Sequence, residues 1–323
     1  MRHAGLLQAS EVSSAAYVGH NADPALTLVS LLDRSDVVTL GADGGGLDDL
    51  YGLSVLGREQ KSGRRWLLWS HAWCHKTVLA RRDKIAPRLL DFSADGDLTI
   101  TDRIGDDVVQ IADIVEQIRD AGKFPETGAI GVDPVGIGAL LDELGKRGIT
   151  ASTKDAAGMI DGISQGWQLQ GAIKALERKL AGDELVHSGS RMMAWCVGNA
   201  KVEPRANGLL ITKQASGFAK IDPLMAAFNA VALMEKNPRP GSGIFEYYKS
   251  AAAANGPRAD GLPGGSHERP KKVCLRAPAG ISTVYGISGR QYVVGADRLI
   301  ETTEEDAKPL IGQGFERLAK AET

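Results

Sequence analysis

The sequence predicts an α/β domain with a mixed sheet flanked by helices, followed by a small α+β appendage at the C-terminal end. Apolar runs rich in β-forming residues at 36–42, 50–57 and 65–73 are joined by short turn-like segments, which is typical of an antiparallel meander. Segments of helical periodicity then alternate with short apolar strands as far as residue 236. The next segment, 237–270, is rich in glycine, proline and alanine, which is a linker composition.

Composition divides the chain into four segments. Residues 1–35 are weakly patterned and are expected to form a leader or linker, and residues 36–236 are expected to form the main domain. After the linker at 237–270, residues 271–323 are expected to form a small C-terminal domain of short strands and one helix at about 303–311. A chain of 323 residues can bury one large core and a smaller satellite core.

The main domain has a definite order of elements. After the three-stranded meander, we expect helices at 77–92 and 106–121, a strand at 127–132, a helix at 136–147, a strand at 148–153, and helices at 164–181 and 222–236. Three consecutive strands followed by alternating helices and strands is the order of a ribonuclease-H-like sheet. A Rossmann-like sheet gives similar runs, but without the opening meander.

Composition also limits the classes of function. The formal net charge is −2, so any contact with nucleic acid must be local and not spread over a polycationic surface. The three cysteines form no Cys-x-x-Cys pair, which fits a reducing compartment and argues against a disulfide framework or a cysteine-rich zinc site. No apolar stretch reaches transmembrane length, so we expect no membrane partner.

Three aspartates stand at nearly equal spacing, each at the end of a predicted element. Asp43 follows the run Val-Val-Thr-Leu-Gly-Ala, Asp133 follows Ala-Ile-Gly-Val, and Asp222 opens an apolar helix. Ligands of open α/β sheets gather at the carboxyl ends of the strands. Three carboxylates gathered there repel one another unless a divalent cation holds them. The pattern therefore predicts metal-dependent phosphate chemistry.

Each of these residues has a plainer interpretation when it is taken alone. Asp133-Pro134 and Asp222-Pro223 look like helix N-caps followed by proline at the first helical position. Asp43 lies in a glycine loop that fits a plain turn or an anion-binding nest. Asp49 is a candidate auxiliary metal ligand, and Lys213 could neutralise a phosphate, although a solvated surface lysine is the default. The three aspartates together favour the functional interpretation.

One nucleotide-binding motif can be excluded. The sequence contains no Gly-x-x-x-x-Gly-Lys-Ser/Thr, and no lysine follows the glycine loop after Asp43. A P-loop nucleotide site is therefore not encoded in these residues.

From about residue 37 to 238 the sequence resembles the nuclease domain of the phage terminase large subunit, the DNA-packaging motor. The matching motifs, in order, are Val-Thr-Leu-Gly-Ala-Asp43, Asp48-Asp49-Leu50, Ile-Gly-Val-Asp133, Gln165-Gly166, Lys174 with Glu177, His187, Trp195 with Asn199, Ile-Thr-Lys213 and Lys220-Ile-Asp222. Each motif is short, but their order over most of the main domain is fairly specific. The resemblance implies a ribonuclease-H-like fold and cleavage of concatemeric double-stranded DNA.

The resemblance also implies a mechanism. The chain would be a metal-dependent endonuclease that cuts double-stranded phage DNA during genome packaging, in the cytoplasm of the bacterial host cell. Asp43, Asp133 and Asp222 would bind two Mg²⁺ or Mn²⁺ ions, with Asp43 as the best candidate to bridge them. Asp49 would support a metal through water, and Lys213 would stabilise the charge that develops on the phosphate.

Partners follow from the same resemblance. Besides double-stranded DNA, they would be the small terminase subunit, the portal and a packaging ATPase. Members of the family usually carry the ATPase on the same chain, so we expect a separate subunit with the ATPase supplied in trans, a truncated prophage remnant, or an excised domain. Residues 271–323 would contact the portal, the capsid or another terminase subunit.

Two other classes of protein stay open from the sequence. A sugar or acetate kinase of the actin-like class shares this core and often has an Asp-Gly-Gly-Gly loop, but the sequence shows no convincing second phosphate loop or adenosine loop. A non-catalytic packaging adaptor would use the same acids as helix caps. ATP binding tests for the kinase, and stabilisation by metal ions separates a metal site from a scaffold.

Overall fold

The computed structural model describes residues 21–205, 208–213 and 219–241, and toward the C-terminus residues 272–278, 283–285, 291–294, 297–303, 307, 310–311 and 315–318. The chain separates into two compact units, Met1–Asn255 and Gly256–Thr323. The boundary between them falls inside the segment 237–270 that the sequence predicts as a linker. Among the described residues, no helix is both long and apolar enough to cross a membrane.

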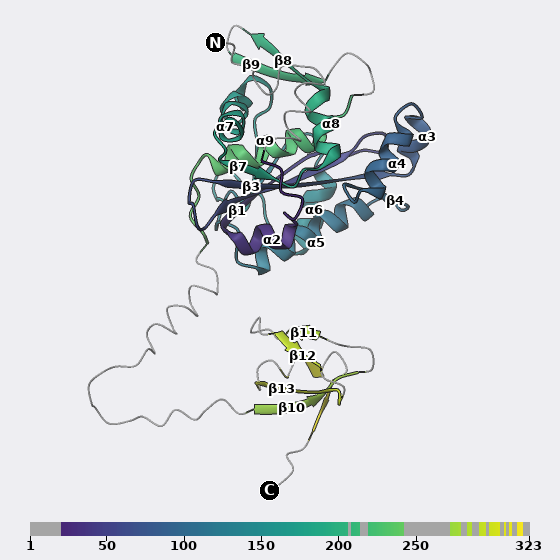
Figure 1. Ribbon diagram of the computed structural model, residues 1–323, viewed down its shortest axis with the longest axis vertical. Coiled ribbons are helices and arrows are strands. Elements are labelled where there is room, and N and C mark those ends of the chain that lie inside the picture. The colour runs from purple at the N-terminus through teal and green to yellow at the C-terminus, as the bar shows by residue number, and fades with distance from the viewer. Residues whose placement is uncertain are drawn as a thin grey trace, which may run out of the picture. The chain divides into compact units, whose positions relative to one another are not determined.

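The first unit is built on a seven-stranded mixed sheet (Figure 1). The strands are β1 (Ser35–Gly44), β2 (Tyr51–Glu59), β3 (Trp66–His75), β4 (Leu98–Thr101), β5 (Ile130–Val132), β6 (Ile160–Gly162) and β7 (Leu185–His187). Their order is β4-β3-β2-β1-β5-β6, and β7 pairs with β3. β1, β2 and β3 form the expected antiparallel meander, and β5 and β6 continue the sheet parallel to β1.

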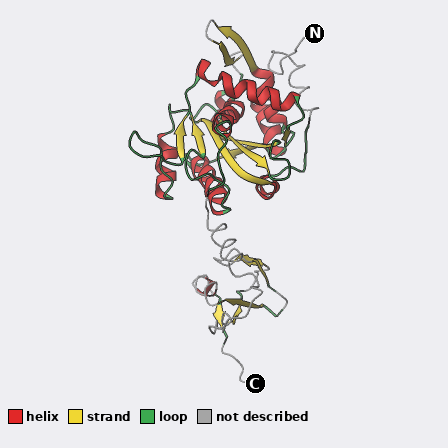
Figure 2. Ribbon diagram, turned by 90° about the vertical axis from the view of Figure 1, so that its left-hand side faces the viewer, coloured by secondary structure: helices red, strands yellow, loops and turns green. Residues whose placement is uncertain are grey.

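Helices cover both faces of this sheet (Figure 2). The helices are α2 (Leu28–Arg34), α3 (Thr77–Arg81), α4 (Ala86–Ala94), α5 (Asp106–Asp120), α6 (Gly138–Lys146), α7 (Gln170–Ala181), α8 (Arg191–Asn199) and α9 (Asp222–Met234), with a 3₁₀ turn η1 at Gly166–Leu169. Buried residues of α2, α5 and α6 share one core cluster, and those of α4, α7, α8 and α9 share the other. The predicted ribonuclease-H-like architecture, a mixed sheet flanked by helices, is confirmed.

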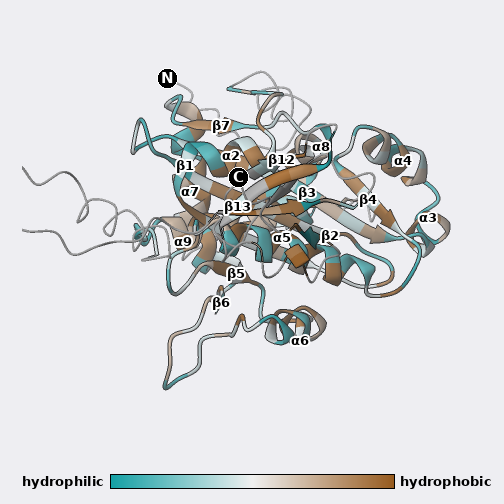
Figure 3. Ribbon diagram, turned by 90° about the horizontal axis from the view of Figure 1, so that it is seen from below, coloured by the Kyte–Doolittle hydropathy of each residue, from teal (hydrophilic) through white to brown (hydrophobic). Residues whose placement is uncertain are grey.

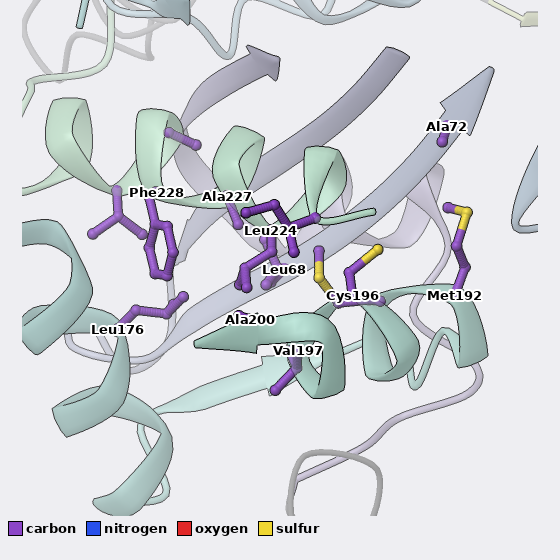
Figure 4. Packing of buried hydrophobic residues seen from close by; sticks show 14 of the residues in the cluster. Leu68, Ala72, Leu176, Met192, Cys196, Val197, Ala200, Leu224, Ala227 and Phe228 are labelled. Carbon is purple, nitrogen blue, oxygen red and sulfur yellow. The ribbon is translucent and has the colours of Figure 1, made fainter. Parts of the chain in front are cut away.

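The two core clusters follow the alternation of side chains along the strands. Val37 and Leu56 belong to the cluster under α9, whereas Val38 and Val55, their neighbours in sequence, belong to the opposite cluster. Figure 3 shows hydrophobic colour along central strands such as β3 and hydrophilic colour in many of the outer loops. Figure 4 shows Phe228 of α9 in the cluster that β3 and α8 also line.

Helix α9 lies unusually close to the backbone of the sheet. A Cβ atom on Gly41 of β1 would come within 1.8 Å of the Ala226 carbonyl oxygen, and one on Gly52 of β2 would come within 2.4 Å of the Asp222 carbonyl carbon. Interiors are close-packed, so neither contact can accommodate a side chain. These two glycines therefore allow α9 to lie directly on β1 and β2, with its first residue on β2 and its second turn on β1.

The expected helix at 77–92 is divided into α3 and α4, and β4, β7 and α8 were not predicted from the sequence. Three further differences from the sequence predictions follow. The strand expected at 148–153 lies later, as β6, and only Ala151 of the expected segment makes an isolated bridge, to Ile160. The hydroxyls of Ser152 and Thr153 instead accept hydrogen bonds from nearby backbone N–H groups, which competes with strand pairing. In the segment expected as a leader, Leu31 and Leu32 of α2 are buried in the core.

The third difference is a hairpin that the sequence did not indicate. β8 (Ala200–Arg205) and β9 (Gly208–Lys213) pair with each other in a separate two-stranded sheet. Its last residue is Lys213, so the hairpin places this side chain.

The second unit contains several short strands among its described residues. β10 (Lys272–Arg276), β13 (Leu299–Thr303) and β14 (Glu316–Arg317) form one sheet, and β11 (Thr283–Tyr285) pairs with β12 (Gln291–Val293). These strands and the segments beside them have a small core cluster of their own. The helix expected at 303–311 falls mostly outside the described residues.

Candidate functional site

Asp43 and Asp133 lie beside each other at one edge of the sheet. β1 and β5 are neighbouring parallel strands in which Ala42 pairs with Val132, so the residues that follow these two are also neighbours. Adjacent strands are separated by about 4.8 Å. Both aspartates line a pocket of about 320 Å³ together with Lys213.

Asp222 is distant from Asp43 and Asp133 in sequence but lies at the same edge of the sheet. Asp43 is the register partner of Gly52, and Gly52 is the residue on which the Asp222 backbone rests. Oδ1 of Asp222 lies 3.2 Å from the position that a Cβ on Gly44 would occupy. The close packing of α9 therefore brings the third aspartate next to the end of β1.

The carboxyl groups of Asp43 and Asp222 lie in an environment that disfavours their charged forms. Burial, followed by the charges of Asp222 and Asp133, raises the pKa of Asp43 to about 8. Burial and the charge of Asp49 raise the pKa of Asp222 to about 6, against the opposing effect of Lys213. These acids are therefore close enough to repel one another and are only partly compensated by protein cations.

Neither Asp133 nor Asp222 caps a helix. Asp222 is the first residue of α9, the N-cap position is Ile221, and no side chain makes a capping hydrogen bond there. Oδ1 of Asp133 accepts a hydrogen bond from the Val135 N–H at 2.9 Å, but α6 begins only at Gly138. The plainer interpretation of both residues as helix caps does not account for their positions.

One carboxylate oxygen in the site is left without a donor. Oδ2 of Asp222 is buried and has no hydrogen-bond partner among the described residues. A buried, unsatisfied acceptor is costly, and native structures usually satisfy such atoms with a protein group, water or an ion. A cation at this atom would relieve both the missing bond and the repulsion among the acids.

Two lysines neutralise part of this charge. Lys213 Nζ lies 3.6 Å from Oδ1 of Asp222 and 3.6 Å from Oδ2 of Asp49. The Lys220 side chain is 4% exposed; it forms an ion pair with Asp49 and donates to the Asp48 carbonyl oxygen at 3.2 Å. Burial tends to raise the pKa of Asp49, but the hydrogen bond and charge of Lys220, together with the charge of Lys213, outweigh it and lower this pKa. Asp49 is thus next to the three acids and paired with Lys220.

The residues fit a divalent cation, although they do not form a finished cage. Within the described part of the chain, no three carboxylate, imidazole or thiolate groups form a ready-made metal cluster. The available donors are carboxylate oxygens, which suit Mg²⁺ and Mn²⁺. The unsatisfied Asp222 oxygen and the raised pKa of Asp43 are the features that a bound cation would correct.

The sequence pattern did not reveal that Lys220 is buried. A lysine two residues before Asp222 is by default solvated, and its burial depends on contacts with Asp48 and Asp49, which are far away in sequence.

We expect Lys220→Met to lower the free energy of unfolding by about 2 kcal/mol, because it leaves the Asp49 charge without its buried partner. Chemical denaturation of this variant beside Lys236→Met, whose lysine pairs with Asp161 at the surface, measures the effect. Equal stability of the two variants would contradict it.

No protein-family model matches this chain, and no curated protein matches it. Solved structures of phage large terminases do match. The crystal structure of the HK97 bacteriophage large terminase has a TM-score of 0.53 and 18% sequence identity, and the match covers 69% of this chain and 43% of that chain.

Two further matches have lower scores. The large terminase nuclease from thermophilic phage G20c gives a TM-score of 0.37 at 14% identity, covering 61% of this chain and 81% of that chain. The large terminase from a second thermophilic bacteriophage gives 0.41 at 11% identity, covering 67% of this chain and 43% of that chain. The match to the HK97 large terminase confirms, at the level of the fold, the resemblance that the sequence indicates. At 18% identity the HK97 likeness defines the fold, and the match spans less than half of the HK97 protein.

Proposed function

We propose that this chain is a metal-dependent endonuclease that cleaves double-stranded phage DNA during genome packaging. The observation that carries the proposal is the convergence of Asp43, Asp133 and Asp222 at one sheet edge, with a buried Asp222 oxygen that lacks a donor among the described residues. The fold shared with the HK97 large terminase supports it. Carboxylates in this arrangement are the ligands of two-metal phosphodiester hydrolysis.

The roles of the residues follow from their positions. Asp43, Asp133 and Asp222 would hold two Mg²⁺ or Mn²⁺ ions, and Asp43 is best placed to contact both because it neighbours each of the other two. When bound, such ions supply an activated water and stabilise the leaving oxygen. Lys213, at the pocket wall, would bind a phosphate oxygen of the DNA and neutralise its developing charge. Asp49, fixed by Lys220, would act through a water molecule.

The proposed partners derive from the likeness to phage terminases. They are double-stranded DNA, a small terminase subunit, the portal and a packaging ATPase, in the cytoplasm of a bacterial host cell. DNA contacts would be mainly to phosphates, since the formal net charge of −2 leaves only local cations such as Lys213 for binding.

Cleavage of a supercoiled plasmid tests the proposal. Nicking or linearisation with Mn²⁺ or Mg²⁺, and none with EDTA, is the expected result. An increase in melting temperature with Mn²⁺ in the absence of DNA tests the metal site separately. Binding of ATP without cleavage would support an actin-like kinase instead, and the absence of cleavage and of any metal-induced shift would support a non-catalytic adaptor.

The raised pKa of Asp43 predicts how the stability of the metal-free protein depends on pH. Folding raises this pKa from 3.8 to about 8, so between these values the folded state holds a proton that the unfolded state has released. In EDTA the free energy of unfolding should therefore fall as pH rises from about 4 to about 8. The upper limit of this fall is about 1.4 kcal/mol for each unit by which the folded and unfolded pKa values differ.

Melting temperatures of the metal-free protein at about pH 5.5 and about pH 8.5 check this dependence. We expect the lower value at the higher pH, and a smaller difference for Asp43→Asn, which cannot ionise. Mn²⁺ should also reduce the difference, because it binds the ionised carboxylates. A metal-free melting temperature that rises with pH would contradict the environment described for Asp43.

A further inference from the structure

Four segments that leave the sheet at the carboxyl ends of parallel strands each expose one large apolar side chain. They are Leu47 after β1, Ile104 after β4, Val135 after β5 and Trp167 after β6, with exposed fractions of 39%, 74%, 79% and 51%. β5 and β6 run parallel to β1. β1 and β3 are both antiparallel to β2, so they run in the same direction, and β4 is parallel to β3. All four segments therefore start from the same edge as Asp43 and Asp133.

Three of these side chains belong to the loops that build the candidate site. Leu47 lies four residues after Asp43, and the N–H of Val135 donates to the Asp133 carboxylate at 2.9 Å. Trp167 directly follows Gln165 and Gly166, which line the same pocket as the two acids. We call these three apolar side chains the rim, because their segments leave the same edge of the sheet as the acids.

Trp167 is the largest side chain of this rim, and the core does not use it. Two residues further along η1, Leu169 takes the buried position and is 2% exposed, whereas half of the Trp167 surface faces solvent. An exposed indole offers a flat face that stacks on bases and deoxyribose with little dependence on sequence. Apolar side chains also insert into the minor groove between base steps.

We propose that Trp167 contacts double-stranded DNA beside the scissile phosphate, packing its ring against a sugar or base. The inference rests on the nuclease function proposed above and adds a substrate-contacting residue to it. The chain neighbours of Trp167, Gln165 and Gly166, line the pocket of the acids, so the contact would fall near the scissile phosphate. DNA is favoured over a protein partner because Trp167 directly follows Gln165 and Gly166, which line the pocket that also contains Asp43, Asp133 and Lys213.

The test measures DNA affinity without cleavage. A short fluorescent duplex is titrated in Mn²⁺ with the full chain carrying Asp43→Asn, alone and combined with Trp167→Ala, Trp167→Phe or Leu90→Ala. Leu90 on α4 is 52% exposed, close to the 51% of Trp167, but it lies outside the four segments. It is therefore the matched control. We expect Trp167→Ala to weaken binding on the order of tenfold, and Trp167→Phe and Leu90→Ala to change it little.

Each outcome bears on the inference in a definite way. Equal DNA affinity of the Trp167→Ala and Leu90→Ala proteins would overturn the inference. It would also be overturned if Trp167→Ala left DNA affinity unchanged and instead lost binding to another packaging protein. The Mn²⁺-induced rise in melting temperature, measured without DNA on the Trp167→Ala protein with Asp43 intact, should equal that of the unmodified protein. If no variant shows this rise and the unmodified chain does not cut plasmid, the nuclease proposal itself has failed.

Discussion

Replacing Asp43 with asparagine is expected to remove metal-dependent DNA cleavage and to leave the fold intact. Asp43 is the acid next to both Asp133 and Asp222, and its carboxylate would contact both ions. Asparagine keeps the shape but lacks the charge that divalent ions require. Changes in the outer shell of a metal site typically cost about 10–100-fold, so loss of a direct ligand should cost more than about 100-fold.

Plasmid cleavage and circular dichroism of Asp43→Asn measure these two effects together. The charge repulsion in the metal-free site would also be relieved, so the thermal stability of the variant in EDTA should equal or exceed that of the unmodified protein. Asp133→Asn and Asp222→Asn should likewise lose cleavage. Asp106→Asn, on the first turn of α5, serves as the control that keeps it. Retained activity in two of the three site variants would show that the site is assigned wrongly.

A single methyl group on β1 is expected to destabilise the domain strongly. In Gly41→Ala the new Cβ would lie 1.8 Å from the Ala226 carbonyl oxygen and 2.6 Å from the Ala230 nitrogen, so α9 must move away from the sheet. Overpacking a core typically costs about 1–3 kcal/mol, and displacing a buried helix backbone should exceed that range. Urea denaturation should show a loss of about 3 kcal/mol or more, or no folded protein.

The chain offers a matched control for this substitution. Gly145 lies within α6, and a Cβ added there meets nothing within 4 Å. Gly145→Ala should therefore stabilise the domain by about 0.5–1 kcal/mol, since alanine has the better helix propensity. If Gly41→Ala proved as stable as Gly145→Ala, the close contact between α9 and β1 would be refuted.

Much of the fold could be predicted because its local signals agree with its tertiary structure. The meander consists of apolar strands joined by short turns, and α5, α7 and α9 lie close to the positions given by their apolar periodicity. The strand at 148–153 was predicted wrongly because one apolar run near a glycine was taken as a strand, whereas pairing with β5 selects Ile160–Gly162. Sequence periodicity contains no information about which of two short segments finds a partner.

The site could be predicted in part for a similar reason. Aspartates that follow apolar strands necessarily lie at a sheet edge, so the proximity of Asp43 and Asp133 follows from parallel pairing. The burial of Lys220 and the position of Lys213 depend on contacts with Asp48, Asp49 and the β8–β9 hairpin, which are distant in sequence. The glycine contacts that seat α9 are likewise visible only once the helix is placed.

The packing of α9 on β1 and β2 also determines when the site can form during synthesis of the chain. Asp43 and Asp133 emerge from the ribosome long before Asp222, which arrives with α9. Contacts between such distant segments form late, because closing a long loop has a high entropic cost. A nascent or truncated chain that ends before residue 222 lacks the third acid and could not complete the proposed metal site. Cleavage of DNA would thus be withheld until translation of the whole domain is finished.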